Sequence, residues 1–242
     1  MGSIGAIFNV ILYQPLLNLL ILFYTYLPGH DFGVAIIVLT LVIRFLLYPL
    51  MAQSIRSQKV LSEIQPKIQE LQKKYKDDKE KQMKEMMALY KEAKINPLGS
   101  FLPLLIQFPI LIALYQVFWK GFQPSSMSSL YSFVPNPGTI DPTFLGLINL
   151  SQASIILAFI AGIAQFVQSK MMTPAVKGPK SSSQISDRMQ NQMLYILPIF
   201  TVFILWKLPA AIGLYWVITS LFSIAQQYFI LKKPSKQHDY AK

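Results

Sequence analysis

The sequence of 242 residues contains no cysteine and few charged residues. The absence of cysteine excludes disulfide bonds, thiolate nucleophiles and cysteine-ligated metal or iron–sulfur centres. Charged residues make up 14% of the chain, against about 25% in an ordinary soluble domain. Hydrophobic residues make up 53%. A soluble chain of this length cannot bury so much apolar surface, so the composition predicts an integral membrane protein.

Motifs of the common enzyme classes are also missing. The chain has no Walker loop, no G-x-G-x-x-G and no G-x-S-x-G. Its two histidines, His30 and His238, are too far apart to suggest a metal cluster. The long apolar stretches contain no Asp or Glu, which proton-coupled carriers usually place in the membrane. We therefore expect a protein that is not an enzyme and that needs no cofactor or metal.

Five stretches are apolar enough to cross a membrane, a task that needs about 20 residues. They predict an all-α integral membrane protein with a five-span helical bundle. The first span is residues 33–51, and region 97–231 holds the other four. The five predicted spans are residues 33–51, 98–119, 146–169, 192–207 and 211–231.

The basic residues predict how this bundle is oriented. Of 22 Lys and Arg residues, eleven lie in 52–96, four in 170–191 and four in the tail 232–242. Basic loops collect on the cytoplasmic side of a membrane, and five alternating spans place these three segments on one side. The N-terminus and the loop 120–145 are then outside the cell, and the C-terminus is cytoplasmic.

The N-terminal segment, residues 1–32, leaves two interpretations open. Residues 4–27 are apolar enough to span, yet Gln14, Asn18 and Thr25 share one face of a helix and Pro15 interrupts it. This pattern favours an amphipathic helix that lies in the outer interface of the membrane. A sixth span, with the N-terminus inside, is the alternative.

Residues 52–96 have a different character, with eleven basic and seven acidic residues. Apolar residues alternate at three- and four-residue steps in two runs, separated by the polar turn Lys76-Asp77-Asp78. The runs are Leu61, Ile64, Ile68, Leu71 and Tyr75, then Lys79, Met83, Met86, Tyr90 and Ala93. This spacing predicts a cytoplasmic antiparallel helical hairpin. Pro66 is expected to kink its first helix.

Arg44 is the charged residue placed deepest in a predicted span. An arginine at the centre of a membrane helix costs roughly 2.5–3.5 kcal/mol on insertion scales. Its side chain could snorkel to the interface, or it could lie in a hydrated cavity. No acid within a span is available to pair with it, so water, backbone carbonyls or a visiting anionic group must satisfy its donors.

Polar residues on other spans favour the cavity. Thr40 and Tyr48 share the face of Arg44. Trp216, Thr219, Ser223 and Gln226 form one face of the last span, and Gln107 and Gln165 lie in the second and third spans. A polar face in hydrocarbon is costly unless it meets water or another polar face. Hydrogen bonds that only hold the bundle together are the alternative explanation.

Several runs of residues resemble, in order and spacing, the YidC-type membrane protein insertases. They are LTLVIRFLLYPL, IQPKIQEL, MMALYKEAKINPLGSFLPLLIQFPILIALY and IGLYWVITSLFSIAQQ. The resemblance implies a five-span core with a cytoplasmic hairpin and a hydrophilic groove open to the cytoplasm and the bilayer. It places Arg44 and Thr40 in that groove, and Gln107, Tyr215 and Trp216 along it or its apolar border. Gln165, a polar residue of the third span, and Thr219, on the polar face of the last span, complete the set of candidate groove residues.

The resemblance implies an insertase and chaperone of the bacterial inner membrane that works without nucleotide hydrolysis. Expected partners are nascent membrane protein clients and membrane lipids, with the ribosome and the Sec translocon as further candidates and no specific nucleic acid sequence. The chain lacks the large outer domain and the lipobox cysteine that some relatives have, and its tail is short. Two other classes stay open: a small channel or carrier, and a structural membrane scaffold.

Overall fold

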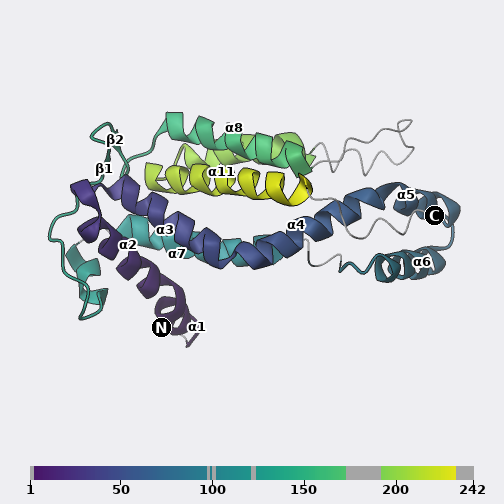
Figure 1. The fold of residues 1–242 in the computed structure, drawn as a ribbon, viewed down its shortest axis with the longest axis horizontal. Helices are drawn as coiled ribbons and strands as arrows, with labels where there is room; N and C mark the ends of the chain where they lie inside the picture. Colours follow the sequence, from purple (N-terminus) through teal and green to yellow (C-terminus); the bar gives the residue numbers. More distant parts are fainter. Residues whose placement is uncertain (1–2, 97–98, 100–101, 121–123, 173–191, 233–242) are drawn as a thin grey trace.

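We describe a computed structural model of the chain over residues 3–96, 99, 102–120, 124–172 and 192–232. The predicted segments 170–191 and 232–242 lie mostly outside these residues. The described part is largely helical, as the apolar composition predicts. Figure 1 shows a bundle of long helices from which α4 leads to two shorter helices, α5 and α6.

The bundle is built from five apolar helical segments. α3 (Phe32–Leu46) and α11 (Ala210–Lys232) pack against each other, and α8 (Ile155–Met172) packs on both α11 and α10 (Leu197–Leu205). α7 (Leu102–Lys120) contacts α11 and α4. The core contains residues that are fully buried, among them Phe32, Ile36, Leu114, Phe118 and Ile212.

Two glycines allow α8 to approach its neighbours closely. A Cβ atom added at Gly162 would collide with the side chain of Val202 on α10. A Cβ added at Gly213 on α11 would lie 3.3 Å from Cβ of Leu157 on α8. Small residues at such contacts are typical of membrane helices, where close packing replaces the hydrophobic effect as the force that joins helices.

The first predicted span, residues 33–51, is not one straight helix. α3 ends at Leu46, and α4 (Tyr48–Glu63) begins after a break and runs at 64° to it. Pro49 lies in the first turn of α4, where its missing N–H costs least. A second break separates α4 from α5 (Gln65–Lys74) and places Pro66 in the first turn of α5, so the expected kink is a helix boundary.

The third span was predicted over residues 146–169, but its helix begins nine residues later than 146, at Ile155. Residues Thr143–Phe144 (β1) and Ile148–Asn149 (β2) form a short antiparallel pair, and α8 begins only at Ile155. The turn between the strands has positive φ angles at Leu145 (51°) and Gly146 (69°). Hydropathy alone did not reveal this turn, because the leucines and isoleucines around it are as apolar as a membrane helix.

The N-terminal segment is a helix with one wider turn: α1 (Ser3–Phe8), a π-helical turn (Asn9–Tyr13) and α2 (Gln14–Tyr26). It packs on α3 and α7. Its polar residues do not form a water-facing stripe, because Asn18 is buried and its Nδ2 donates to Ser129 O at 3.2 Å, while Tyr131 N donates to Asn18 Oδ1 at 2.6 Å. A short 3-10 helix, Pro124–Ser129, supplies the first of these partners.

By length and composition, three helices could cross a membrane: Gly5–Tyr26, Ile155–Met172 and Ala210–Lys232. The broken pair α3 and α4 would make a fourth. Leu105–Lys120 and Leu194–Leu205 are apolar but shorter; the latter includes part of a π-helical turn, Gln192–Ile196. The structure therefore supports an α-helical membrane protein, and the five-span arrangement remains a prediction.

Helices α5 and α6 (Lys79–Glu92) lie side by side at the far end of α4 (Figure 1). The turn between them contains the predicted Lys76-Asp77-Asp78, and Asp78 caps α6 by accepting a hydrogen bond from Lys81 N at 2.9 Å. Within the predicted seam Ile68 is buried, but Met83 is 64% exposed. Its neighbour Gln82 turns inward and donates to Gln72 O. Met86 and Tyr90 are half-buried and Ala93 is buried, as predicted, so the seam differs only at the start of α6.

Candidate functional site

The two helices that carry most of the candidate residues, α3 and α11, pack against each other through polar faces. Thr40 and Arg44 are buried on α3, with exposed fractions of 1% and 7%. On α11 the buried polar residues follow one face of the helix at steps of three and four. They are Thr219, Ser220, Ser223, Gln226 and Gln227.

Arg44 lies in the last turn of α3, two residues before the break at Leu46–Tyr48. Its Nε has no hydrogen-bond partner among the described residues. Neither α3 nor α11 contains an Asp or Glu. Tyr215 on α11 is close enough for an electrostatic interaction with the guanidinium. Arg44 is thus a buried cation without a fixed anionic partner in the part of the chain that the structure describes.

Unpaired polar atoms lie on both of these helices. Within the described ranges, four buried side-chain atoms have no hydrogen-bond partner. One is Arg44 Nε, and the other three are on α11: Thr219 Oγ1, Ser220 Oγ and Gln227 Oε1. Each buried polar atom without a partner costs about 1–3 kcal/mol, so four of them on two facing helices need an explanation such as bound water or a bound polar chain.

The hydroxyl groups that do find partners bond within their own helix. Thr40 Oγ1 donates to Ile36 O at 2.6 Å, and Ser223 Oγ donates to Thr219 O at 2.9 Å. Each bond joins residues four apart, so it does not connect α3 with α11. The hydroxyls of Thr40 and Ser223 therefore do not join the two helices.

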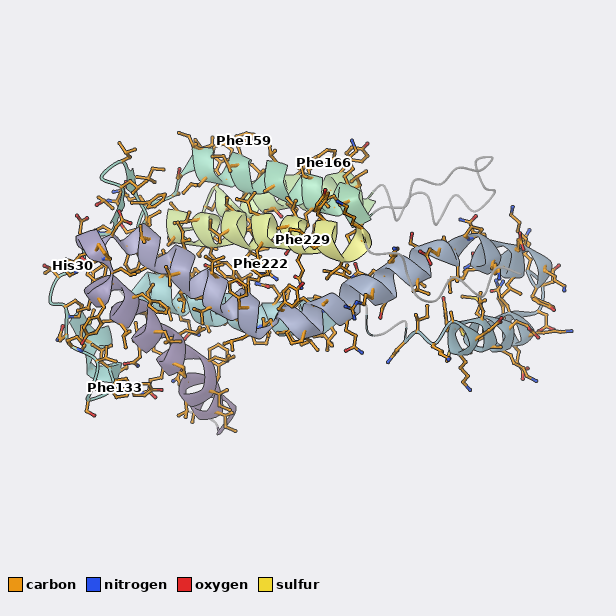
Figure 2. All side chains as sticks on the ribbon, viewed as in Figure 1. His30, Phe133, Phe159, Phe166, Phe222 and Phe229 are labelled. Carbon is orange, nitrogen blue, oxygen red and sulfur yellow. The ribbon has the colours of Figure 1, made fainter. Side chains whose placement is uncertain are left out.

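The break between α3 and α4 adds a backbone group to the site. Gln226 Nε2 on α11 donates to Tyr48 O, the carbonyl of the first residue of α4, at 3.1 Å. Phe222, one turn earlier, lies with its ring centroid 5.2 Å from that of Phe45 and 6.5 Å from that of Tyr48. In Figure 2 Phe222 points from α11 toward α3. An aromatic contact and a polar contact thus fix α11 against the break.

Gln107 and Tyr215 are joined directly. Gln107 Nε2 on α7 donates to the hydroxyl oxygen of Tyr215 at 2.6 Å, and Tyr215 is 2% exposed. This bond connects α7 to α11. The resemblance implies that both residues line a groove; the structure shows that they contact each other, and their role in a groove stays a prediction.

Gln165 and Trp216 form a second pair, on the α8 side of α11. Trp216 Nε1 donates to Gln165 Oε1 at 3.1 Å. Both side chains are half-buried. Their mutual hydrogen bond supports the explanation that Gln165 holds α8 to α11. Ser220 and Gln227 follow Trp216 by four and eleven residues, so they lie on this same side of α11.

Sequence reasoning missed Ser220 and Gln227. Both lie beside the polar face that the spacing identified, and both have an unpaired buried oxygen. Ser220, Ser223 and Gln227 recur at steps of three and four, which was a usable signal. The face is wider than the single line through Trp216, Thr219, Ser223 and Gln226.

Helices α3 and α11 contain no Asp or Glu, so they offer no carboxylate for covalent or acid–base catalysis. It can offer a cation, hydroxyls and amide groups inside an apolar bundle. Such a surface binds water or a polar chain more favourably than hydrocarbon does, since an unpaired polar group in lipid costs several kcal/mol.

Comparison with known proteins gives a consistent result. The family model described as 60Kd inner membrane protein matches residues 22–237. A protein of Clostridium tetani named membrane protein insertase YidC is 39% identical over 211 residues, which cover 87% of this chain and 86% of that protein. A protein of the same name in Fusobacterium nucleatum is 34% identical over 203 residues, covering 84% and 87%. One in Magnetococcus marinus is 37% identical over 222 residues, covering 91% of this chain and 35% of that longer protein.

Proposed function

This chain belongs to the 60Kd inner membrane protein family, and we propose that it is a membrane protein insertase of the bacterial inner membrane. It moves short hydrophilic segments of new membrane proteins into the bilayer and acts on them as a chaperone. The observation that carries the mechanism is the buried, unpaired Arg44 between two polar helix faces.

The polar faces of α3 and α11 form the wall of a hydrophilic groove in this proposal. Water in the groove would satisfy Arg44 Nε and the unpaired oxygen of Thr219. A hydrophilic client segment then replaces that water and avoids much of the hydrocarbon layer. Arg44 attracts acidic residues of the segment, because opposite charges interact strongly where little bulk water surrounds them.

The energy for insertion comes from the client itself. Burial of a large apolar side chain contributes about 1.5–3 kcal/mol, and a membrane segment contains about 20 mostly apolar residues. Summed over the segment, this gain exceeds the cost of moving a short polar tail through a hydrated groove. The proposed reaction therefore needs no nucleotide hydrolysis.

The proposed orientation places α5 and α6 in the cytoplasm and the loop from Pro124 to Asn149 outside. The hairpin region 52–96 holds half of the chain's basic residues, which cytoplasmic segments favour. It would face the side on which ribosomes deliver clients. The five spans run through α3, α7, α8, α10 and α11, and the N-terminal helix lies in the outer interface.

A cysteine-labelling experiment tests this orientation. The chain has no cysteine, so a cysteine introduced at one position is unique. Ser128→Cys should react with an impermeant reagent added outside the cell, and Ser182→Cys should react only when the reagent reaches the cytoplasm. Labelling of both positions from the same side would show the orientation to be wrong.

A depletion experiment tests the function. Cells depleted of their own insertase should grow and insert a short-tailed client when this chain is expressed. Purified protein in liposomes should insert the same client without nucleotide and should not pass ions. Ion flux without insertion would favour a channel. Rescue of growth without insertion of the client, by the parent and by an Arg44-neutral variant alike, would favour a structural scaffold.

A further inference from the structure

A second feature of the bundle lies on a different face of α11, away from the polar contact with α3. Between α8 and α11 the surface is hollowed over a volume of about 530 Å³. Its lining is apolar: Ile160, Ile163, Ala164 and Val167 from α8, and Leu221 and Ile224 from α11. We call this hollow the α8–α11 groove. Ile163 and Leu221 are 64% and 51% exposed, so the groove opens on the side of the bundle.

Basic residues stand at one end of the α8–α11 groove. Lys170 follows Val167 by three residues on α8, and Lys232 follows Ile224 by eight on α11, so both continue the faces that line the groove. Both lysines are exposed. The neighbouring residues Met172 and Leu231 pack against one cluster with Ala52 and Ile55 of α4, so the two helices end side by side. Figure 1 shows the same arrangement.

No acidic residue lies on α8 or α11 to neutralise these lysines. The amine of Lys232 lies 5.6 Å from the ring centroid of Tyr228, one turn earlier, so the ring holds the cation near the end of the groove. The α8–α11 groove is therefore apolar along its length and has two positive charges at one end.

We propose that the α8–α11 groove binds one anionic phospholipid, with an acyl chain along the groove and the phosphate between Lys170 and Lys232. The apolar lining of the groove matches the acyl chain, and the two lysines at its end match the negative charge of the phosphate. A client helix fits less well, because an apolar helix brings no anionic group to Lys170 and Lys232. In the proposed orientation the lipid belongs to the cytoplasmic leaflet, whose anionic headgroups attract basic residues.

The test is native mass spectrometry of the full chain, purified in detergent with phosphatidylglycerol or phosphatidylcholine. The parent should retain phosphatidylglycerol in preference to phosphatidylcholine. Lys170→Gln combined with Lys232→Gln should weaken phosphatidylglycerol retention by about 30-fold, the factor for two basic residues at about 1 kcal/mol each. Because both lysines are exposed, this variant should keep the parent's helical circular dichroism.

Two further variants separate the parts of the proposal. Lys120→Gln with Lys207→Gln removes the same charge from two exposed lysines elsewhere on the bundle and should leave retention unchanged. Ala164→Phe fills the groove and should reduce the retention of both lipids. Equal retention of the two lipids by the parent, or an equal loss in both lysine pairs, overturns the proposal.

Photocrosslinking decides the identity of the occupant. Phosphatidylglycerol with a photoreactive acyl chain should label peptides that contain Ile163 and Leu221. If an uncharged apolar 20-residue peptide labels these positions and removes the lipid label, the groove is a client site and the lipid proposal is wrong. The measurement is lipid binding by purified protein, so it does not depend on the insertion activity proposed above.

Discussion

Arg44 gives the sharpest test of the proposed groove. The residue is 7% exposed, and its Nε has no partner among the described residues. Removing one member of a buried ion pair usually costs 3–5 kcal/mol, because the other charge is left alone. α3 and α11 offer no such partner, so Arg44→Ala should leave the protein folded and in the membrane.

The effect on insertion should be larger and should depend on the client. Opposite charges 4 Å apart attract by about 4 kcal/mol at an effective dielectric of 20 and by about 1 kcal/mol in bulk water. These limits correspond to about 800-fold and about fivefold in rate. Arg44→Ala should therefore slow the insertion of acidic-tailed clients by a factor in that range. Arg44→Lys retains the charge but loses the two-pronged geometry, and should keep much of the activity.

The assay is protease protection of a client in liposomes that contain the purified parent or variant. A matched client, with its tail acids changed to Asn and Gln, provides the control and should be affected much less by Arg44→Ala. If Arg44→Ala inserts the acidic-tailed client as fast as the parent does, the charge has no role in entry. The arginine would then be only snorkelling, and the mechanism would be wrong.

Two further predictions concern the contacts that hold the helices in place. Asn18→Ala removes the side chain that donates a hydrogen bond to Ser129 O. The free energy of unfolding in detergent should fall by about 1–3 kcal/mol. An unchanged thermal midpoint would contradict a stabilising role for this contact. Gly162→Leu must push against Val202 and should lower stability by about 1–3 kcal/mol through overpacking, whereas Gly5→Leu, with open space around it, should have little effect on the same melting curve.

The sequence predicts the helical class and which polar residues share a helix face, because those features depend on local patterns. The steps of three and four residues brought Thr40 and Arg44 onto one face of α3, and the structure buries both against α11. The polar turn before Asp78 ends one helix and caps the next. In each case the residues that define the feature lie within a few turns of one another.

The features that were missed depend on contacts between distant segments. Pro49 follows Tyr48 in a run that is mostly apolar, and only the structure shows that the chain bends there by 64°. The position of Asn18 on the helical wheel does not decide whether its side chain faces water or protein. Its direction is decided by Ser129 and Tyr131, more than a hundred residues away.

The pattern of paired and unpaired groups distinguishes the two explanations of the polar faces. If they only joined helices, hydroxyls on one helix would bond partners on the other, as Gln107 does with Tyr215 and Trp216 does with Gln165. Thr40 instead bonds its own backbone, and Arg44 Nε has no partner in the described chain. The hydroxyls between α3 and α11 therefore do not join the two helices, and Gln226 reaches only the backbone of Tyr48. In the proposed groove, water completes Arg44, and the polar segment of a client can replace that water because it brings the same hydrogen-bonding groups.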